Sequence, residues 1–142
     1  MSNFQLDSRL TADTFLVGSF ELCEVRLMDD IRWPWLVLVP KVANLAEIHD
    51  ASSSQQEKIA FETALVAEAL KKHTNCEKIN SAAIGNIVRQ LHIHVIARNE
   101  GDANWPGPVW GFGERQPYDG GTKEKLIIEL QRALASSADF TF

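Results

Sequence analysis

The chain has 142 residues, of which 45% are hydrophobic and 23% are charged, and a formal net charge of −5. This is the composition of a globular protein, and the length predicts one domain over residues 1–142 whose core needs no disulfide or metal for stability. The negative charge argues against a nucleic acid polymer as a partner, and the longest apolar stretch, residues 33–40, is too short to span a membrane.

The first half of the chain predicts three strands. Residues 14–19 are apolar and β-prone, and residues 23–28 alternate in part, so together they predict an antiparallel hairpin. Residues 29–34 suit a turn. Residues 35–39 then form an unbroken apolar run, typical of a buried strand, which Pro40 ends.

A long helix follows, and Ser53 with Gln56 predicts a capping box at its start. Glu68 and Lys72 form an i,i+4 pair on its polar side. Its apolar side is made by residues at helical spacing, namely Ile59, Thr63, Val66 and Leu70.

The second half predicts two more strands and a final helix. Residues 76–84 are the weaker strand candidate and residues 90–98 the stronger, with a turn at Gly85-Asn86 between them. A loop rich in Gly, Pro and Trp runs to about residue 121, and Thr122 can cap the last helix. The apolar stripe of that helix consists of Leu126, Ile127, Leu130, Ala133 and Leu134.

These elements predict an α+β fold on an antiparallel sheet, because the strands gather around one helix without βαβ alternation. The N-terminal segment carries charges and no long apolar run, so we expect no signal peptide. Cys23 and Cys76, far apart in the chain, suit free thiols in a reducing cytoplasm, where we expect the protein to act.

The strand over residues 90–98 carries the most informative pattern. Alternate side chains of a strand point to opposite faces, so Gln90, His92 and His94 share one face while the apolar residues between them face a core. Arg98 falls on the same face as His94, roughly 13 Å further along, and we expect it at the rim or in solvent.

Three interpretations of the histidine pair remain open on residue types alone. Two neighbouring imidazoles can supply a nucleophile and a partner that holds its tautomer. His-x-His is also a metal-ligand arrangement, and a polar strand face need have no function. His49 and His73 fall near the ends of the long helix, so no third ligand is clustered nearby, although Asp102 could serve as one.

The segment Gln90–Ile96, Gln-Leu-His-Ile-His-Val-Ile, resembles the histidine-triad (HIT) motif. Residues 27–31 and 36–41 resemble the strands of the HIT nucleotide pocket. A following Trp-Pro-Gly-Pro-Val-Trp-Gly loop, residues 105–111, resembles a bacterial HIT subgroup that keeps Gln-Leu-His-x-His. Further positions at about the expected distances from His92 are Asn80, Gly85 and the Trp105-Pro106 pair.

The resemblance implies a five-stranded antiparallel sheet with a long central helix and a C-terminal helix, and it implies catalytic roles for three residues. His92 would attack the α-phosphorus and become a nucleotidyl-histidine. His94 would hydrogen-bond the phosphate or the leaving oxygen. Gln90 stands where most members have the first histidine, and its amide can donate and accept but cannot titrate near neutral pH.

The resemblance also implies a substrate-binding set. Asp30 would bind ribose hydroxyls, Asn80 would contact the phosphate or the leaving group, and Gly85 would let the backbone approach the phosphate. Trp105 is one of four tryptophans able to stack on a ligand or to pack in a core. The chain departs from the family pattern at two further places: Pro34-Trp35 replaces the usual Gly-His pair, and Ile87 replaces a usual Ser or Thr.

The sequence therefore predicts a nucleotide hydrolase or nucleotidyl transferase that cleaves a phosphoramidate or phosphoanhydride at the α-phosphate, without metal or cofactor. Its partner would be a small-molecule nucleotide, and the Trp-rich loop and the striped last helix predict a homodimer. The alternatives are a nucleotide-binding regulatory module with little turnover, and a small metalloenzyme using His92 and His94.

Overall fold

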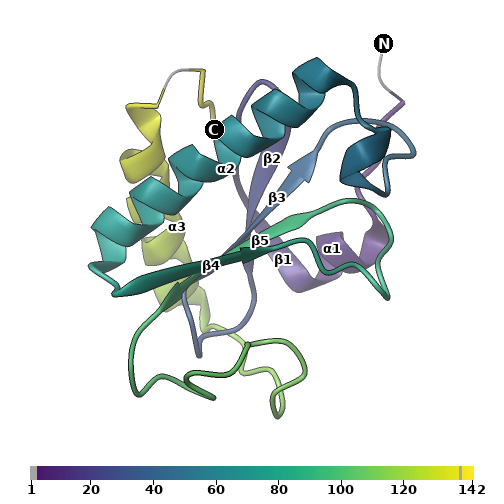
Figure 1. Cartoon of the computed structure of the whole chain (residues 1–142). Coiled ribbons are helices and arrows are strands. Elements are labelled where there is room, and N and C mark those ends of the chain that lie inside the picture. Colours follow the sequence, from purple (N-terminus) through teal and green to yellow (C-terminus); the bar gives the residue numbers. More distant parts are fainter. Residues whose placement is uncertain (1–2, 138) are drawn as a thin grey trace.

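A five-stranded antiparallel sheet forms the centre of the computed structural model, which describes residues 3–137 and 139–142. The order across the sheet is β1-β2-β3-β5-β4, so β4 and β1 are its edges (Figure 1). This confirms the α+β class and the five strands. Their bounds are β1 Thr14–Ser19, β2 Cys23–Met28, β3 Trp35–Pro40, β4 Lys78–Ala82 and β5 Ile93–Arg98.

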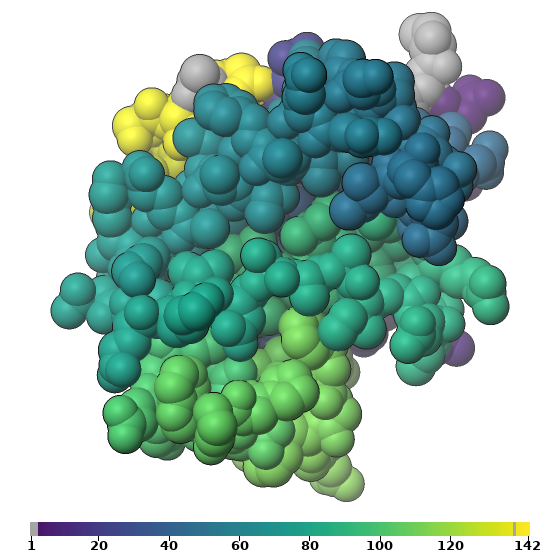
Figure 2. Space-filling model, in the orientation of Figure 1, coloured from purple at the N-terminus to yellow at the C-terminus, as the bar shows by residue number. Residues whose placement is uncertain are grey.

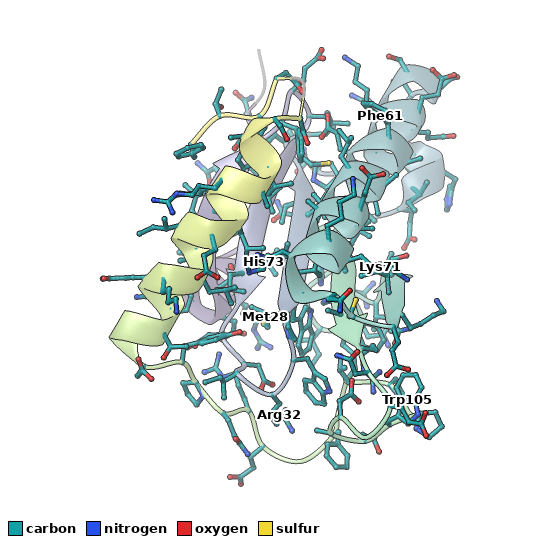
Figure 3. The ribbon with its side chains drawn as sticks, turned by 90° about the vertical axis from the view of Figure 1, so that its left-hand side faces the viewer. Met28, Arg32, Phe61, Lys71, His73 and Trp105 are labelled. Atoms are coloured by element: carbon teal, nitrogen blue, oxygen red, sulfur yellow. The ribbon has the colours of Figure 1, made fainter. Side chains whose placement is uncertain are left out.

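Two long helices, α2 (Ser53–Thr74) and α3 (Gly120–Ala135), lie side by side on one face of the sheet (Figures 1 and 3). A short helix α1 (Ser8–Asp13) and a 3-10 turn η1 (Ile48–Asp50) complete the regular elements. Neither short element was expected, because a segment of one or two turns has too few positions for an apolar periodicity. Among the described residues no helix is both long and apolar enough to cross a membrane.

Both long helices begin at residues other than those expected. The capping box of α2 joins Ser52 and Gln55, one residue before the predicted Ser53 and Gln56. A run of three serines followed by two glutamines offers the same spacing in two registers, so the pattern could not separate them. Helix α3 begins after Asp119, whose carboxylate accepts the backbone N–H of Thr122, so Thr122 is inside the helix rather than its cap.

The sheet buries apolar side chains on both faces. Residues of β3 and β5 that face α2 and α3, such as Leu36, Leu38 and Val95, belong to the larger core. The other face carries a second core around Trp33 and Trp35. It is covered by α1, the N-terminal segment and the loop after β5, as Leu10, Leu6 and Val109 show. The apolar stripe of α3 is used within the chain, because Leu130 and Leu134 are buried in the larger core.

The strand that carries the histidines begins later than predicted. Residues 90–92 precede β5, which starts at Ile93 and pairs with β3 and β4. The backbone N–H of Leu91 donates instead to the carbonyl of Leu45, outside the sheet. The weaker candidate over residues 76–84 is shortened in the same way to β4.

A buried carboxylate joins α2 to the turn between β1 and β2. Glu62 is 4% exposed, and its two oxygens accept the backbone N–H groups of Cys23 at 2.7 Å and Leu22 at 3.1 Å. Burial and the nearby Glu62 raise the pKa of the Cys23 thiol, which therefore stays protonated. Cys23 and Cys76 are both free and buried.

We expect Glu62→Ala to lower the free energy of unfolding by about 2–4 kcal/mol, because two buried N–H groups lose a charged acceptor. Urea denaturation of the native protein and the variant measures the difference. Glu68→Ala is the matched control, since Glu68 lies on the same helix and forms an exposed ion pair with Lys72. An equal loss in both variants would contradict a structural role for Glu62.

Candidate active site

His92 and His94 lie side by side at the start of β5. Their ring centroids are 4.9 Å apart, and the two residues are 5% and 3% exposed. The residues before, between and after them, Leu91, Ile93 and Val95, belong to the core under α2 and α3. The alternation expected from the sequence therefore places the two imidazoles together on the face opposite the helices.

The His92 ring is oriented by a backbone carbonyl. Its Nδ1 lies 2.7 Å from the carbonyl oxygen of Gln90. A carbonyl oxygen can only accept, so Nδ1 carries a proton, and the neutral form of the ring has its lone pair on Nε2. Gly85 borders the ring: a Cβ on this residue would lie 3.4 Å from His92 Cε1 and 2.5 Å from the carbonyl oxygen of Val88. Only glycine fits there, and it lets the backbone come close to the imidazole.

His92 lines a cleft of about 350 Å³ between the segment before η1 and the loop over residues 83–91. Gly85, Gln90 and the charged side chains of Arg89 and Glu47 also line it. A neighbouring cleft of about 470 Å³ shares Arg89 and Gln90 and continues to the N-terminal segment. Three of the predicted site residues, Gly85, Gln90 and His92, thus meet at one cavity.

His94 is enclosed more deeply than His92. Its Nδ1 lies 3.0 Å from the indole nitrogen of Trp35, and its Nε2 lies 3.3 Å from the carbonyl oxygen of Ile84. The rings of Trp35 and Trp110 pack against it, at centroid distances of 5.6 and 5.2 Å. Burial, and secondarily the neighbouring His92, lower the pKa of His94 to about 4. The ring is therefore neutral at physiological pH.

The side chain of Gln90 turns to the N-terminal segment. Its Oε1 accepts the backbone N–H of Asp7 at 2.9 Å, and its Nε2 donates to the carbonyl of Gln5 at 2.8 Å. Gln90 therefore acts on His92 through its backbone carbonyl and holds residues 5–7 through its amide. These partners are more than 80 positions away in the chain, so no local pattern could reveal them.

Asp30 lies apart from the histidine cleft. It is 2% exposed and forms an ion pair with Arg32, with Oδ2 2.7 Å from Nη2 and Oδ1 2.9 Å from Nε. Both residues line a separate cleft of about 210 Å³, to which Trp35 and Phe112 also contribute. In Figure 3, Arg32 lies at the same end of the molecule as Trp105 and far from Phe61 of α2.

Asn80 and Trp105 both contact Arg98. Arg98 donates to Asn80 Oδ1 at 3.0 Å, and its guanidinium lies 5.5 Å from the centroid of the Trp105 ring. The expectation that Arg98 lies at the rim or in solvent is wrong, because it is 1% exposed. The buried charge of Arg98 is compensated by Asp102, which the sequence left open as a metal ligand. The carboxylate of Asp102 accepts two hydrogen bonds of 2.8 Å from the guanidinium.

The contact of Trp35 with His94 was not expected from the sequence. The sequence analysis treated Trp35 as one of four tryptophans able to stack or pack and as part of the replacement of a Gly-His pair, yet strand pairing could have found the contact. Trp35 lies opposite Ile96 and Val37 opposite His94, so Trp35 and His94 are diagonal neighbours on one face. Among the described residues, no group of three or more His, Cys, Asp or Glu side chains is arranged to hold a metal ion.

Comparison with known proteins agrees with this geometry. Residues 9–101 match the HIT domain family model. A histidine triad (HIT) protein from Sinorhizobium meliloti 1021 is 51% identical, with a TM-score of 0.91, over 93% of this chain and 98% of that chain. A histidine triad protein from Marinobacter aquaeolei VT8 is 42% identical, with a TM-score of 0.92, over 95% of this chain and 98% of that one.

A more distant structure shares the fold. A hypothetical histidine triad nucleotide-binding protein from Sulfolobus tokodaii strain7 is 18% identical, with a TM-score of 0.67, over 86% of this chain and 84% of that one. No curated protein matched the chain. The fold is that of a histidine-triad protein, and the chain belongs to the HIT domain family. Membership supports, in general terms, a nucleotide-binding or hydrolase-type function.

We expect Gln90→Ala to release the N-terminal segment. The backbone amide of Asp7 loses its acceptor, so its hydrogen exchange should accelerate by about tenfold, the scale for one hydrogen bond. Exchange measured by NMR or mass spectrometry on residues 5–7 gives the result. Arg89→Ala is the control, because exposed Arg89 lines the same two clefts. Unchanged exchange at Asp7 in Gln90→Ala would contradict this anchoring role.

Proposed function

We propose that the protein is a nucleotide hydrolase or nucleotidyl transferase that acts at an α-phosphate through a covalent intermediate on His92. The observation that carries this proposal is the hydrogen bond from His92 Nδ1 to the Gln90 carbonyl, which in the neutral ring places the lone pair on Nε2. A neutral imidazole with a free Nε2 is a nucleophile at neutral pH. Its position in a cleft of about 350 Å³ gives a phosphate group access to it.

The reaction proceeds in two displacements. The lone pair on His92 Nε2 forms a bond to the α-phosphorus as the bond from phosphorus to the leaving oxygen or nitrogen breaks, and the leaving group takes up a proton. Water, or a second acceptor, then attacks the phosphorus and releases the imidazole. Arg89 and the backbone at Gly85 border the cleft, where positive charge and N–H groups would stabilise the phosphate oxygens.

The proposal also includes substrate-binding roles for Asp30, Asn80 and Trp105, whose present hydrogen bonds and contacts limit what each can do. Asp30 lines a second cleft beside Trp35 and can accept from ribose hydroxyls only as its pairing with Arg32 rearranges. Asn80 and Trp105 are bound to Arg98, so their contribution would pass through that residue. We also propose a cytoplasmic location, which the two free, buried cysteines support.

We expect an alkaline quench during turnover of a nucleoside phosphoramidate or a dinucleoside polyphosphate to leave nucleotide mass on the peptide with His92. Phosphorus–nitrogen bonds survive base, so peptide mapping by mass spectrometry can detect the adduct. His92→Ala should lose most turnover and still bind nucleotide. His73→Ala is the control, since His73 pairs with Glu129 between α2 and α3.

Three results would contradict the covalent assignment. The adduct could map to His94, His92→Ala could keep near-normal turnover, or EDTA could abolish an activity that added zinc restores. The last result would favour the metalloenzyme. Nucleotide binding without any turnover or adduct across the substrate panel would instead favour a regulatory module.

We propose that the protein is a homodimer that uses the face formed by α2 and β4. This face is turned to the viewer in Figure 2. β4 is an edge strand, and an apolar groove of about 280 Å³ between it and α2 is lined by Ile59 and Ile93. Ile48, which is 44% exposed, lines the same groove. An exposed apolar patch next to a strand edge is typical of an association surface.

We expect sedimentation velocity at micromolar concentration to give a dimer for the native protein and a monomer for Ile48→Glu, because a charge buried in the groove would oppose association. Phe142→Glu is the control, as Phe142 is 73% exposed at the other end of the sequence. A monomer for the native protein would refute the dimer, and a dimer for Ile48→Glu would refute this surface.

A further inference from the structure

The indole of Trp35 determines which nitrogen of His94 can carry a proton. Trp35 Nε1 lies 3.0 Å from His94 Nδ1, and the two residues are 7% and 3% exposed, so water does not compete for the contact. An indole N–H can only donate. The Nδ1 atom of His94 is therefore the acceptor and is unprotonated.

The second nitrogen of His94 is determined by a carbonyl. His94 Nε2 lies 3.3 Å from the oxygen of Ile84, which can only accept, so Nε2 carries the hydrogen. The two imidazoles of the site thus have opposite tautomers. His92 has its hydrogen on Nδ1 and a lone pair on Nε2, whereas His94 has its hydrogen on Nε2.

We propose that Trp35 is a positioning residue that holds His94 as the neutral Nε2–H tautomer, so that the ring beside His92 offers a hydrogen-bond donor. The tautomer itself follows from these contacts, and its catalytic consequence rests on the proposed function. Ile84 lies in the loop that borders the cleft through Ala83 and Gly85. His94 does not itself line that cleft, so a phosphate oxygen there would accept from Nε2–H only when the loop at Ile84 moves and the long bond to its carbonyl opens.

Packing prevents the donor from turning away. The Trp35 ring makes edge contacts with Trp33 and Trp110, at centroid distances of 6.1 and 6.3 Å. Pairing with Ile96 fixes its backbone within the sheet. If Nδ1 carried the hydrogen instead, the Nε2 lone pair would face the phosphate oxygens and repel them. The indole N–H excludes that tautomer, because two N–H groups would then point at each other.

Among the residues that the structure describes, His92 is the titratable group in contact with His94. His92 faces it from the same segment, Trp35 from β3 and Trp110 from the loop after β5, and the Ile84 carbonyl faces it from the loop before β5. Protonation of Nδ1 would require breaking the bond from Trp35. The lowered pKa of His94 agrees with this arrangement.

NMR of the native protein, with nitrogen-15 in the tryptophan and histidine rings, tests the proposal directly. We expect a scalar coupling across the hydrogen bond between Trp35 Nε1 and His94 Nδ1. The nitrogen shifts of His94 should show a bare Nδ1 and a protonated Nε2 from pH 8 to pH 5, and those of His92 at pH 8 the opposite pattern. A protonated Nδ1 on His94, or no coupling, overturns the proposal.

Three variants connect the tautomer to catalysis. Trp35→Phe keeps an aromatic ring without the donor, so His94 should populate both tautomers, and kcat should fall about tenfold with little change in KM. Trp35→His supplies a ring N–H again and should recover part of the loss. Trp33→Phe is the control for loss of an indole N–H: Trp33 is also buried but donates to the Ala103 carbonyl, and phenylalanine keeps a ring against Trp35, so His94 should keep a bare Nδ1 and a protonated Nε2.

The two proposals fail in distinguishable ways. Unchanged His94 shifts in a folded Trp35→Phe protein would refute the role of Trp35. If Trp35→Phe does not fold, the coupling measured on the native protein still decides the question. The expected His94 tautomer without a nucleotide adduct on His92 would refute the proposed reaction and leave the hydrogen bond from Trp35 intact.

Discussion

The pairing of β3 with β5 is the constraint on which the rest of the structure depends. Its register sets Val37 opposite His94 and Trp35 opposite Ile96. These four side chains therefore lie on one face of the sheet, and the residues between them lie on the other. One face is buried under α2 and α3, and the other under the tryptophan-rich core. A slip by one residue would exchange the two faces and bury His94 under the helices. Burial on both faces therefore fixes the positions of the imidazoles.

A polar row inside a doubly covered sheet is tolerated because each of its members has a partner. The two imidazoles are held by the carbonyls of Gln90 and Ile84 and by the indole of Trp35. None of these three groups titrates, so the hydrogen-bond pattern around the histidines does not change with pH through its partners. Arg98 differs from the histidines because it carries a buried charge. It donates hydrogen bonds to Asp102 and Asn80, and the carboxylate of Asp102 compensates the charge. Unpaired, any of these groups would cost free energy of folding.

Much of the fold could be predicted from the sequence because apolar periodicity reports burial directly. The apolar run from Trp35 to Val39 predicted β3. The helical spacing of Ile59, Val66 and Leu70 predicted α2. The family followed from the histidine motif on β5. The exact ends of the strands and helices could not be predicted, because they depend on single hydrogen bonds that no periodicity encodes. The bond from Leu91 N–H to the Leu45 carbonyl is one of these.

The site was predictable only where its contacts are local. His92 and His94 share a face because they are two residues apart, and that follows from strand geometry. The burial of Arg98 could not be foreseen, since its partner Asp102 lies in an irregular loop. The amide of Gln90 binds residues 5 and 7, which only the folded chain brings near. Such distant partners give a side chain a role that its place in a motif does not reveal.

The hold of Gln90 on residues 5–7 has a practical consequence for handling the protein. This stretch borders the cleft next to the histidine cleft, which Asn3 and Gln5 also line. An affinity tag or fusion partner joined to the amino end would emerge beside the proposed entrance for substrate and could occupy it. The carboxyl end follows α3, whose Leu130 and Leu134 are buried in the core on the opposite face of the sheet. A tag at the carboxyl end leaves the entrance open, so protein tagged at that end is the better choice for activity assays.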